Sequence, residues 1–161
     1  MKNITDSLSQ YRYPIESFIS KLEGEKRYYN LTTERVMNWD LVMVEMAKDE
    51  IVAIAGLERK LGLIRSGIML RKELHRKGFG KRFLFEVHEE AKNQGYHVIW
   101  GLVSEGNAAA VQLATSLGYK FLGKRQNMDN VIAPLDSTGR IIYYLARALF
   151  PLVKVIDKVR R

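Results

Sequence analysis

The sequence predicts an α/β protein in which helices flank a sheet, and three observations favour this class. Residues 40–47 and 50–57 are two β-rich runs separated by Lys48-Asp49, a signal for a hairpin. From Phe79 onward, apolar side chains recur at helical spacing, while the charged residues mostly fall on the other side. Residues 96–103 are largely apolar, the pattern of a central strand that is covered on both faces.

The remaining elements follow from the same periodicities. Helices are expected around residues 18–22 and 32–36, a third strand over 63–70, and a helix from Asn107 to Gly118. Two further strands are expected over 119–124 and 140–145, separated by a long polar connection over 125–138.

Length and composition exclude several classes of protein and of functional site. The chain has 161 residues, 47% of them hydrophobic and 27% charged, which suits a single globular domain over residues 1–161. The absence of cysteine excludes disulfides, thiolate metal sites and a catalytic thiol. The three histidines lack metal-ligand spacing and are interpreted as packing or surface residues. The first residues do not resemble a signal peptide, and residues 141–156 are too interrupted for a membrane span, so we expect a cytoplasmic protein.

The most informative stretch is the basic turn that follows the strand ending at Leu70. Six lysines and arginines lie between Arg71 and Arg82, against the single carboxylate of Glu73. Gly78 and Gly80 let the backbone turn tightly and let a ligand approach the start of the following helix. This pattern predicts a cradle for phosphate groups, although a solvated glycine-rich turn would look similar.

Two better-known phosphate motifs are excluded by their spacing. A Walker A loop requires glycine where His75 stands and serine or threonine where Arg82 stands. A dinucleotide fingerprint requires a third glycine at Phe83.

A second motif lies downstream of the basic turn and helps to interpret it. Asn107-Ala108-Ala109-Ala110 begins a helix that ends at Gly118-Tyr119. Together with Gly78-Phe79-Gly80, this order and spacing resemble the acetyl-CoA-binding half of the GNAT superfamily of N-acetyltransferases, over about residues 40–123.

The resemblance implies a mixed, mostly antiparallel sheet flanked by helices, with a splayed central strand pair, and acetyl transfer from acetyl-CoA to a primary amine. The family's opening strand is not obvious in the first forty residues. The implied cofactor-binding residues are the strand end, the turn and the helix cap: Leu70, Lys72, Arg76, Lys77, Gly78, Phe79, Gly80, Lys81 and Asn107. Asn107 could equally be a plain helix cap.

The catalytic residues are less well defined. Glu105 and Glu58 are the candidate general bases, each lying just beyond or at the end of a predicted strand. His75 stands where the family usually has glutamine or arginine, and Ala114 stands where many members have the tyrosine that acts as general acid. The general acid is therefore unassigned.

A non-catalytic module is the alternative: a CoA sensor, or a basic domain that binds polyanions through its net charge of +8. Nucleic acid is not expected as a partner, because the aromatic residues are not interleaved with the basic run. The expected acceptor is a small-molecule or peptide amine whose identity the sequence does not define.

The tail predicts an amphipathic helix over about residues 150–161, starting near Phe150 so that Pro151 falls in its first turn. Its apolar stripe could pack on the chain's own sheet, on a second subunit in a homodimer, or on an anionic membrane surface. The first two are favoured here because the stripe is short.

Overall fold

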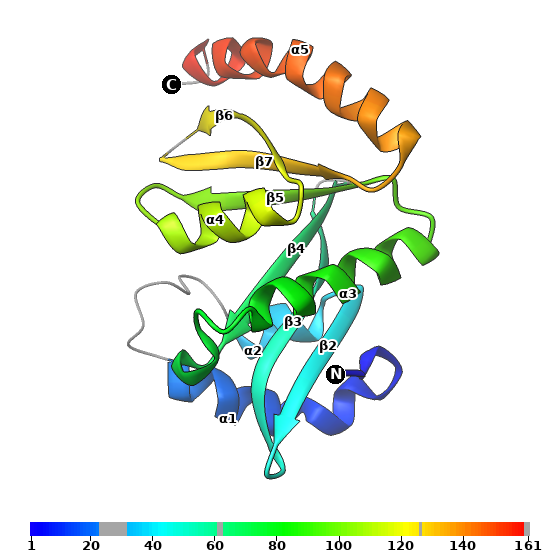
Figure 1. The fold of residues 1–161 in the computed structure, drawn as a ribbon, viewed down its shortest axis with the longest axis vertical. Coiled ribbons are helices and arrows are strands. Elements are labelled where there is room, and N and C mark those ends of the chain that lie inside the picture. Colours follow the sequence, from blue (N-terminus) through cyan, green and yellow to red (C-terminus); the bar gives the residue numbers. More distant parts are fainter. Residues whose placement is uncertain (23–31, 61–62, 126, 160–161) are drawn as a thin grey trace. The chain divides into compact units, whose positions relative to one another are not determined.

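The computed structural model describes residues 1–22, 32–60, 63–125 and 127–159, which form both helices and strands (Figure 1). The chain forms two units, Met1–Val87 and His88–Arg161. Helix α3 runs across the boundary between them in the sequence.

The first unit contains a sheet of four strands. Its elements are β1 (Lys2–Asn3), the 3₁₀ helix η1 (Thr5–Tyr11), α1 (Arg12–Leu22), α2 (Thr33–Met37), β2 (Leu41–Ala47), β3 (Glu50–Lys60), β4 (Leu63–Leu70), the 3₁₀ helix η2 (Lys72–Leu74) and the start of α3 (Phe79–Asn93). The strands pair antiparallel in the order β1-β2-β3-β4. Lys48 and Asp49 both take positive φ in the β2–β3 turn, which confirms the predicted hairpin.

Helix α1 is fixed by its apolar stripe. Ile15, Phe18, Ile19 and Leu22 recur at helical spacing and are all buried in one cluster with strand residues such as Ile54. Complete burial of one such side chain contributes about 1.5–3 kcal/mol, so this stripe holds α1 on the sheet.

Trp39 adds a contact that the sequence did not reveal. Gly56 and Gly67 face each other across β3 and β4, and a Cβ atom on either glycine would lie 2.7–2.9 Å from the Trp39 ring. The indole, which is 6% exposed, therefore lies directly against two adjacent glycine backbones.

The second unit contains a three-stranded sheet and two helices of its own. Its elements are β5 (Val98–Ser104), α4 (Ala108–Ser116), β6 (Lys120–Arg125), β7 (Met128–Pro134) and α5 (Ser137–Val159). The strands pair antiparallel in the order β5-β7-β6. The predicted class, α/β with a mostly antiparallel sheet and flanking helices, is confirmed.

The last third of the chain differs from the prediction in three ways. Residues 140–145 were expected to form a strand but lie inside α5, and the strand β7 occupies half of the expected polar connection over 125–138. The terminal helix starts at Ser137 and not near Phe150, so Pro151 lies inside it.

The cause of the early start is a helix cap at Asp136. Its carboxylate accepts the Gly139 N–H at 2.7 Å, and its carbonyl accepts the Arg140 N–H at 3.1 Å. Tyr143 and Phe150, seven residues apart, are both buried. The β-branched and aromatic composition of residues 141–144 suggested a strand, but the cap and this helical burial determine the structure.

Candidate active site

The turn between β4 and α3, where the sequence predicts a phosphate cradle, has an unusual backbone. Arg76 and Gly78 have φ values of 59° and 73°, in the left-handed region. Glycine enters this region without steric cost, whereas arginine enters it at a cost in free energy. A Cβ at Gly78 would meet nothing within 4 Å, so the space beside the turn is open.

The start of α3 offers hydrogen-bond donors to an anion. The Arg82 N–H bonds to the Gly78 carbonyl at 3.2 Å as the first bond of the helix, so the N–H groups of Phe79, Gly80 and Lys81 have no partner within it. The first turn of α3 contains no acidic residue, and Lys81 and Arg82 are both exposed there. This helix end is therefore suited to bind a phosphate group.

Gly80 differs from the expectation in one respect. It lies in the first turn of α3, and it is not among the glycines with positive φ. Gly80 therefore leaves the start of the helix without a side chain that could block a ligand. The unusual backbone conformation occurs at Gly78.

His75 connects the turn to the end of β4. Its Nε2 lies 3.1 Å from the Leu70 carbonyl oxygen, and because a carbonyl can only accept, Nε2 must carry the proton. The residue that departs from the family pattern therefore still donates a hydrogen bond, here to the strand that precedes the cradle.

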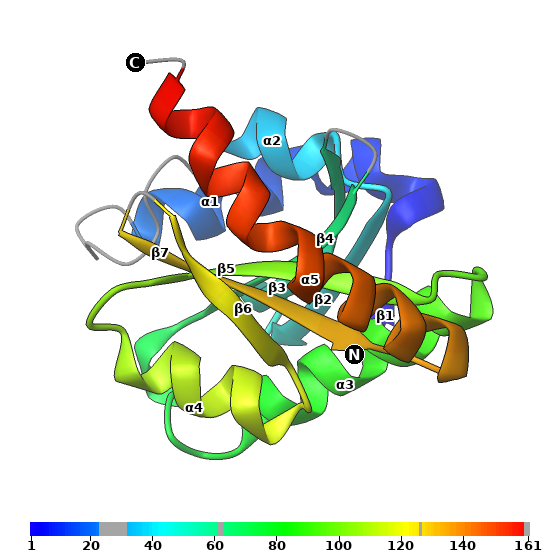
Figure 2. The same ribbon diagram turned by 90° about the horizontal axis from the view of Figure 1, so that it is seen from above.

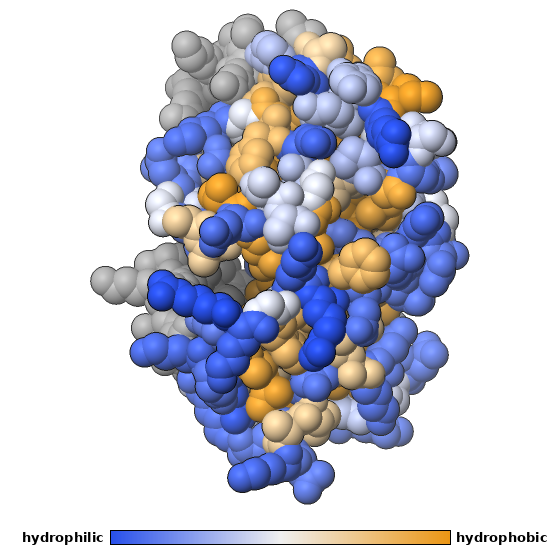
Figure 3. All heavy atoms as spheres, in the orientation of Figure 1, coloured by the Kyte–Doolittle hydropathy of each residue, from blue (hydrophilic) through white to orange (hydrophobic). Residues whose placement is uncertain are grey.

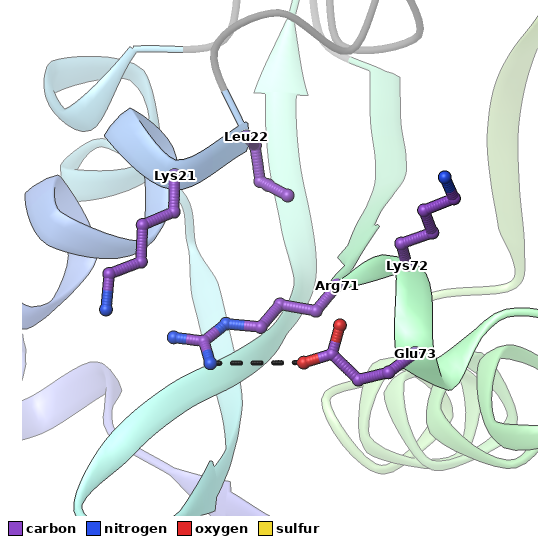
Figure 4. Close-up of a pocket in the computed structure, with 5 residues that line it drawn as sticks. All are labelled: Lys21, Leu22, Arg71, Lys72 and Glu73. Atoms are coloured by element: carbon purple, nitrogen blue, oxygen red, sulfur yellow. Dashed lines mark ion pairs between the residues drawn. The ribbon is translucent and has the colours of Figure 1, made fainter.

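A charged hollow of about 300 Å³ lies beside the same strand end, lined by Lys21, Leu22, Arg71, Lys72 and Glu73 (Figure 4). Lys21 and Arg71 both contact the Glu50 carboxylate, at 2.8 and 2.6 Å. The hydrogen bonds from Lys21 and then Arg71 lower the pKa of Glu50 to about 2. These ion pairs connect α1, the start of β3 and the end of β4, and they help to position the strand end.

Glu58, a candidate base, lies on β3 opposite Arg65. The Arg35 side chain from α2 donates to both of its carboxylate oxygens, at 3.0 and 2.7 Å. The Glu58 side chain is 18% exposed. A proton taken from a substrate would therefore compete with a bidentate guanidinium for the same oxygens.

Glu105, the other candidate base, lies in the turn after β5 and is exposed. The Lys124 ammonium contacts its carboxylate at 2.6 Å. That hydrogen bond, followed by the charge of Lys124, holds the pKa of Glu105 below its usual range. A lowered pKa makes a carboxylate a weaker base, so this environment does not favour catalysis by Glu105.

Asn107 caps α4 as predicted. Its Oδ1 accepts the Ala110 N–H at 3.1 Å, so the two N–H groups of the amide can still donate to a ligand. The predicted cofactor residues from Leu70 to Lys81 thus lie around one turn of the first unit, whereas Asn107 and Glu105 belong to the second.

The position of the usual general acid is filled by a small buried residue. Ala114 on α4 is 7% exposed. Tyr119, which follows α4, is buried and shares a hydrogen bond of 2.9 Å with His88 Nε2. Burial lowers the pKa of His88 to about 4, so this imidazole is neutral near pH 7, and the interpretation of His88 as a packing residue is consistent with its 6% exposure.

Comparison with known proteins identifies the family. Residues 19–133 match the acetyltransferase (GNAT) domain. Because this match covers most of the chain, the protein belongs to the GNAT acetyltransferases.

Individual relatives are more distant. The L-methionine sulfoximine/L-methionine sulfone acetyltransferase of Pseudomonas aeruginosa is 32% identical over 63 residues, which are 39% of this chain and 37% of that protein. The match thus spans little more than a third of the relative's length.

Solved structures share the fold at low identity. The Salmonella typhimurium protein YncA, solved with its cofactor acetyl-CoA, has a TM-score of 0.64 at 17% identity, over 80% of this chain and 90% of that one. The ribosomal-protein-S5-alanine acetyltransferase of Vibrio fischeri has a TM-score of 0.66 at 15% identity, over 80% and 90%. The GNAT domain of Streptomyces lividans PAT has a TM-score of 0.67 at 14% identity, over 78% and 85%.

Proposed function

We propose that this protein is an N-acetyltransferase that transfers the acetyl group of acetyl-CoA to a primary amine within a ternary complex. The observation that carries the proposal is the turn before α3, where two residues in the left-handed region precede a basic helix start. Family membership supports the reaction class, and the solved relative with acetyl-CoA supports the cosubstrate.

In this proposal the pyrophosphate of acetyl-CoA accepts hydrogen bonds from backbone N–H groups of the turn. The contributing residues are Arg76, Lys77, Gly78, Phe79, Gly80 and Lys81. The backbone at Leu70 and Lys72 bonds the pantetheine arm, and the Asn107 amide donates to the cofactor while its oxygen remains in the helix cap. Binding depends mainly on backbone groups, so His75 in place of glutamine or arginine is compatible with it.

The chemistry is then a direct displacement. The neutral amine nitrogen attacks the thioester carbon, the C–N bond forms, the C–S bond breaks, and the electron pair leaves on the CoA sulfur. Placing the amine against the thioester can supply several orders of magnitude of effective concentration. The nitrogen loses one proton to a base in this process.

We assign the base role to Glu58 ahead of Glu105. Both carboxylates are held in ion pairs, Glu58 with Arg35 and Glu105 with Lys124. Glu58 differs in being half-buried on the strand that pairs with β4, whereas Glu105 is exposed. Glu58→Gln should then lower turnover by about 100-fold or more, the range typical of a lost general base. Glu105→Gln is the matched control and should change turnover by less than about threefold.

No side chain is assigned as general acid. A thiol has an ordinary pKa of about 8.5, so a thiolate can leave and take its proton from solvent. This is consistent with Ala114 at the position where many relatives have tyrosine.

For the acceptor, we propose a small amino-acid-like amine as the first class to test. The support is the Pseudomonas relative, whose name specifies L-methionine sulfoximine and L-methionine sulfone. A peptide amine is the other class that the family resemblance allows.

The experiment is release of CoA thiol from acetyl-CoA in the presence of free amino acids, polyamines, aminoglycosides and peptides. Thiol release that depends on one amine class, with formation of the acetylated product, is the expected result. Binding of acetyl-CoA without turnover on any class would instead favour a CoA-sensing module. Retention on polyanions that weakens steeply with salt, without competition by CoA, would favour a polyanion-binding module.

A further inference from the structure

Helix α5 carries an apolar face that no other part of the described chain covers. Ile141, Tyr144, Leu145 and Leu149 recur at helical spacing, and each is between 56% and 66% exposed. Hydrophobic surface appears over α5 in the space-filling view (Figure 3). A contiguous exposed stripe of this kind marks an interaction surface.

The helix does not need this face to stay in place. It lies across β5, β6 and β7 of its own unit (Figure 2) and buries Tyr143 and Phe150. At its start, a Cβ on Gly139 would come within 2.0 Å of the His97 carbonyl oxygen, so helix and sheet edge are in close contact there. The apolar stripe that the sequence predicted for the tail begins at Leu149, which is exposed and not packed on the sheet. The side chains of residues 152–159, which would continue this stripe, lie outside the described part of the chain.

The charges next to the exposed stripe have one sign. Arg140 and Arg147 are exposed, and a spacing of seven residues puts them on one line of the helix. No acidic residue occurs from residue 137 to residue 151. The sequence continues with Lys154 and Lys158 against a single acid, Asp157.

We propose that the outer face of α5, defined by Ile141, Tyr144, Leu145 and Leu149, docks on an anionic lipid surface. Apolar residues beside a basic face are typical of helices that lie in the plane of a membrane interface. The leucine and isoleucine side chains enter the boundary between headgroups and acyl chains, the tyrosine sits at headgroup level, and the arginines reach the lipid phosphates. Among the described residues no helix is long and apolar enough to cross a membrane, so the contact is peripheral.

The charges favour a lipid surface over a second copy of this chain. A two-fold interface brings the same patch of both subunits together. In an antiparallel pairing of the two α5 helices, the lines of Arg140 and Arg147 lie on the same side of the contact, and residues 137–151 contain no acid to compensate them. Such like-charge juxtaposition costs free energy. An anionic membrane can bury the apolar stripe among its acyl chains and pair the adjacent arginines with its lipid phosphates.

The test is cosedimentation of the full chain with vesicles of phosphatidylcholine, with and without phosphatidylglycerol. We expect binding to the anionic vesicles, weaker binding in high salt, and at least a tenfold loss for the double variant Leu145→Glu, Leu149→Glu. The matched control is Tyr13→Glu with Phe85→Glu, which adds the same charge at exposed aromatic residues of α1 and α3 and should bind like the wild type. Thermal melting of each variant checks that it is folded.

Three results would overturn the proposal. One is a wild-type chain that stays in solution with anionic vesicles. The second is equal loss of binding in both double variants, which would show that the loss comes from the change in net charge and not from the apolar face of α5. The third is a dimer by light scattering that the α5 variant alone converts to a monomer without any vesicle binding, which would make this face a contact between subunits.

Discussion

Burial of His88 should make the stability of the protein depend on pH. The pKa of this imidazole is lowered from 6.5 to about 4 because burial penalises its charged form. The unfolded chain therefore binds the proton first as the pH falls. The stability is complete above pH 6.5 and is lost as the pH falls from 6.5 towards 4.

The magnitude follows from the two pKa values. One pKa unit corresponds to about 1.4 kcal/mol, so the free energy of unfolding should fall by about 2 to 3 kcal/mol between pH 7.5 and pH 4.5 from this group alone. Glu50, Asp136 and Glu105, whose pKa values are lowered by hydrogen bonds and ion pairs, act in the same direction at the acid end. A reference variant is needed to separate their effect.

His88→Gln is that reference, because glutamine can still bond the Tyr119 hydroxyl and does not titrate. Urea unfolding of both proteins at several pH values between 4.5 and 7.5 gives the difference in unfolding free energy, in which the carboxylates cancel. We expect the wild type to lose about 2 to 3 kcal/mol relative to the variant as the pH falls. Parallel pH profiles for the two proteins would refute the buried, neutral state of His88.

Three further substitutions test the packing and the site. Gly56→Ala should destabilise the fold by about 1–3 kcal/mol, as measured by urea unfolding, because the new Cβ would lie 2.0 Å from the Leu41 carbonyl oxygen and 2.7 Å from the Trp39 ring; unchanged stability would contradict these two close contacts. Asn107→Asp should keep the cap of α4 yet weaken acetyl-CoA binding in calorimetry, whereas Asn107→Ala should lose both, with about 1 kcal/mol of stability; equal cofactor affinity for Asp and Asn would limit this residue to capping. Ala114→Tyr should lower the melting temperature, because the position is 7% exposed, and a tenfold gain in turnover instead would reveal an open acid site.

The sequence predicted the tight backbone at Gly78 and the ends of α4 because these signals are local. Gly78 is required by its own φ value, and Asn107 and Gly118 mark the ends of α4 through cap geometry within a few residues. The Lys48-Asp49 hairpin is of the same kind. Each of these features depends on neighbours in sequence, which periodicity and turn chemistry describe.

Features that depend on distant partners were not predictable in this way. The contact of Arg35 with Glu58 joins residues 23 positions apart. The packing of Trp39 on two glycines depends on the strand register that sets Gly56 opposite Gly67. The sequence did contain a signal for the early start of α5, because Asp136 is a favourable N-cap residue. The composition of residues 141–144 outweighed that signal in the prediction.

The central claim is that the turn before α3 binds acetyl-CoA, and Gly80→Asp tests it most directly. This change places a carboxylate at the helix end where the pyrophosphate is expected, and Asn93→Asp adds the same charge at the far end of α3 as a control. Acetyl-CoA at 100 times its Kd stabilises a binding protein by about 2.7 kcal/mol. This corresponds to a rise of about 5 to 10 °C in the melting temperature of a chain of this size.

Thermal melting with and without acetyl-CoA is therefore the decisive measurement. The account predicts the full shift for the wild type and for Asn93→Asp, and no shift for a folded Gly80→Asp protein. A full shift in Gly80→Asp would contradict the account, because the cofactor would then bind somewhere other than this turn.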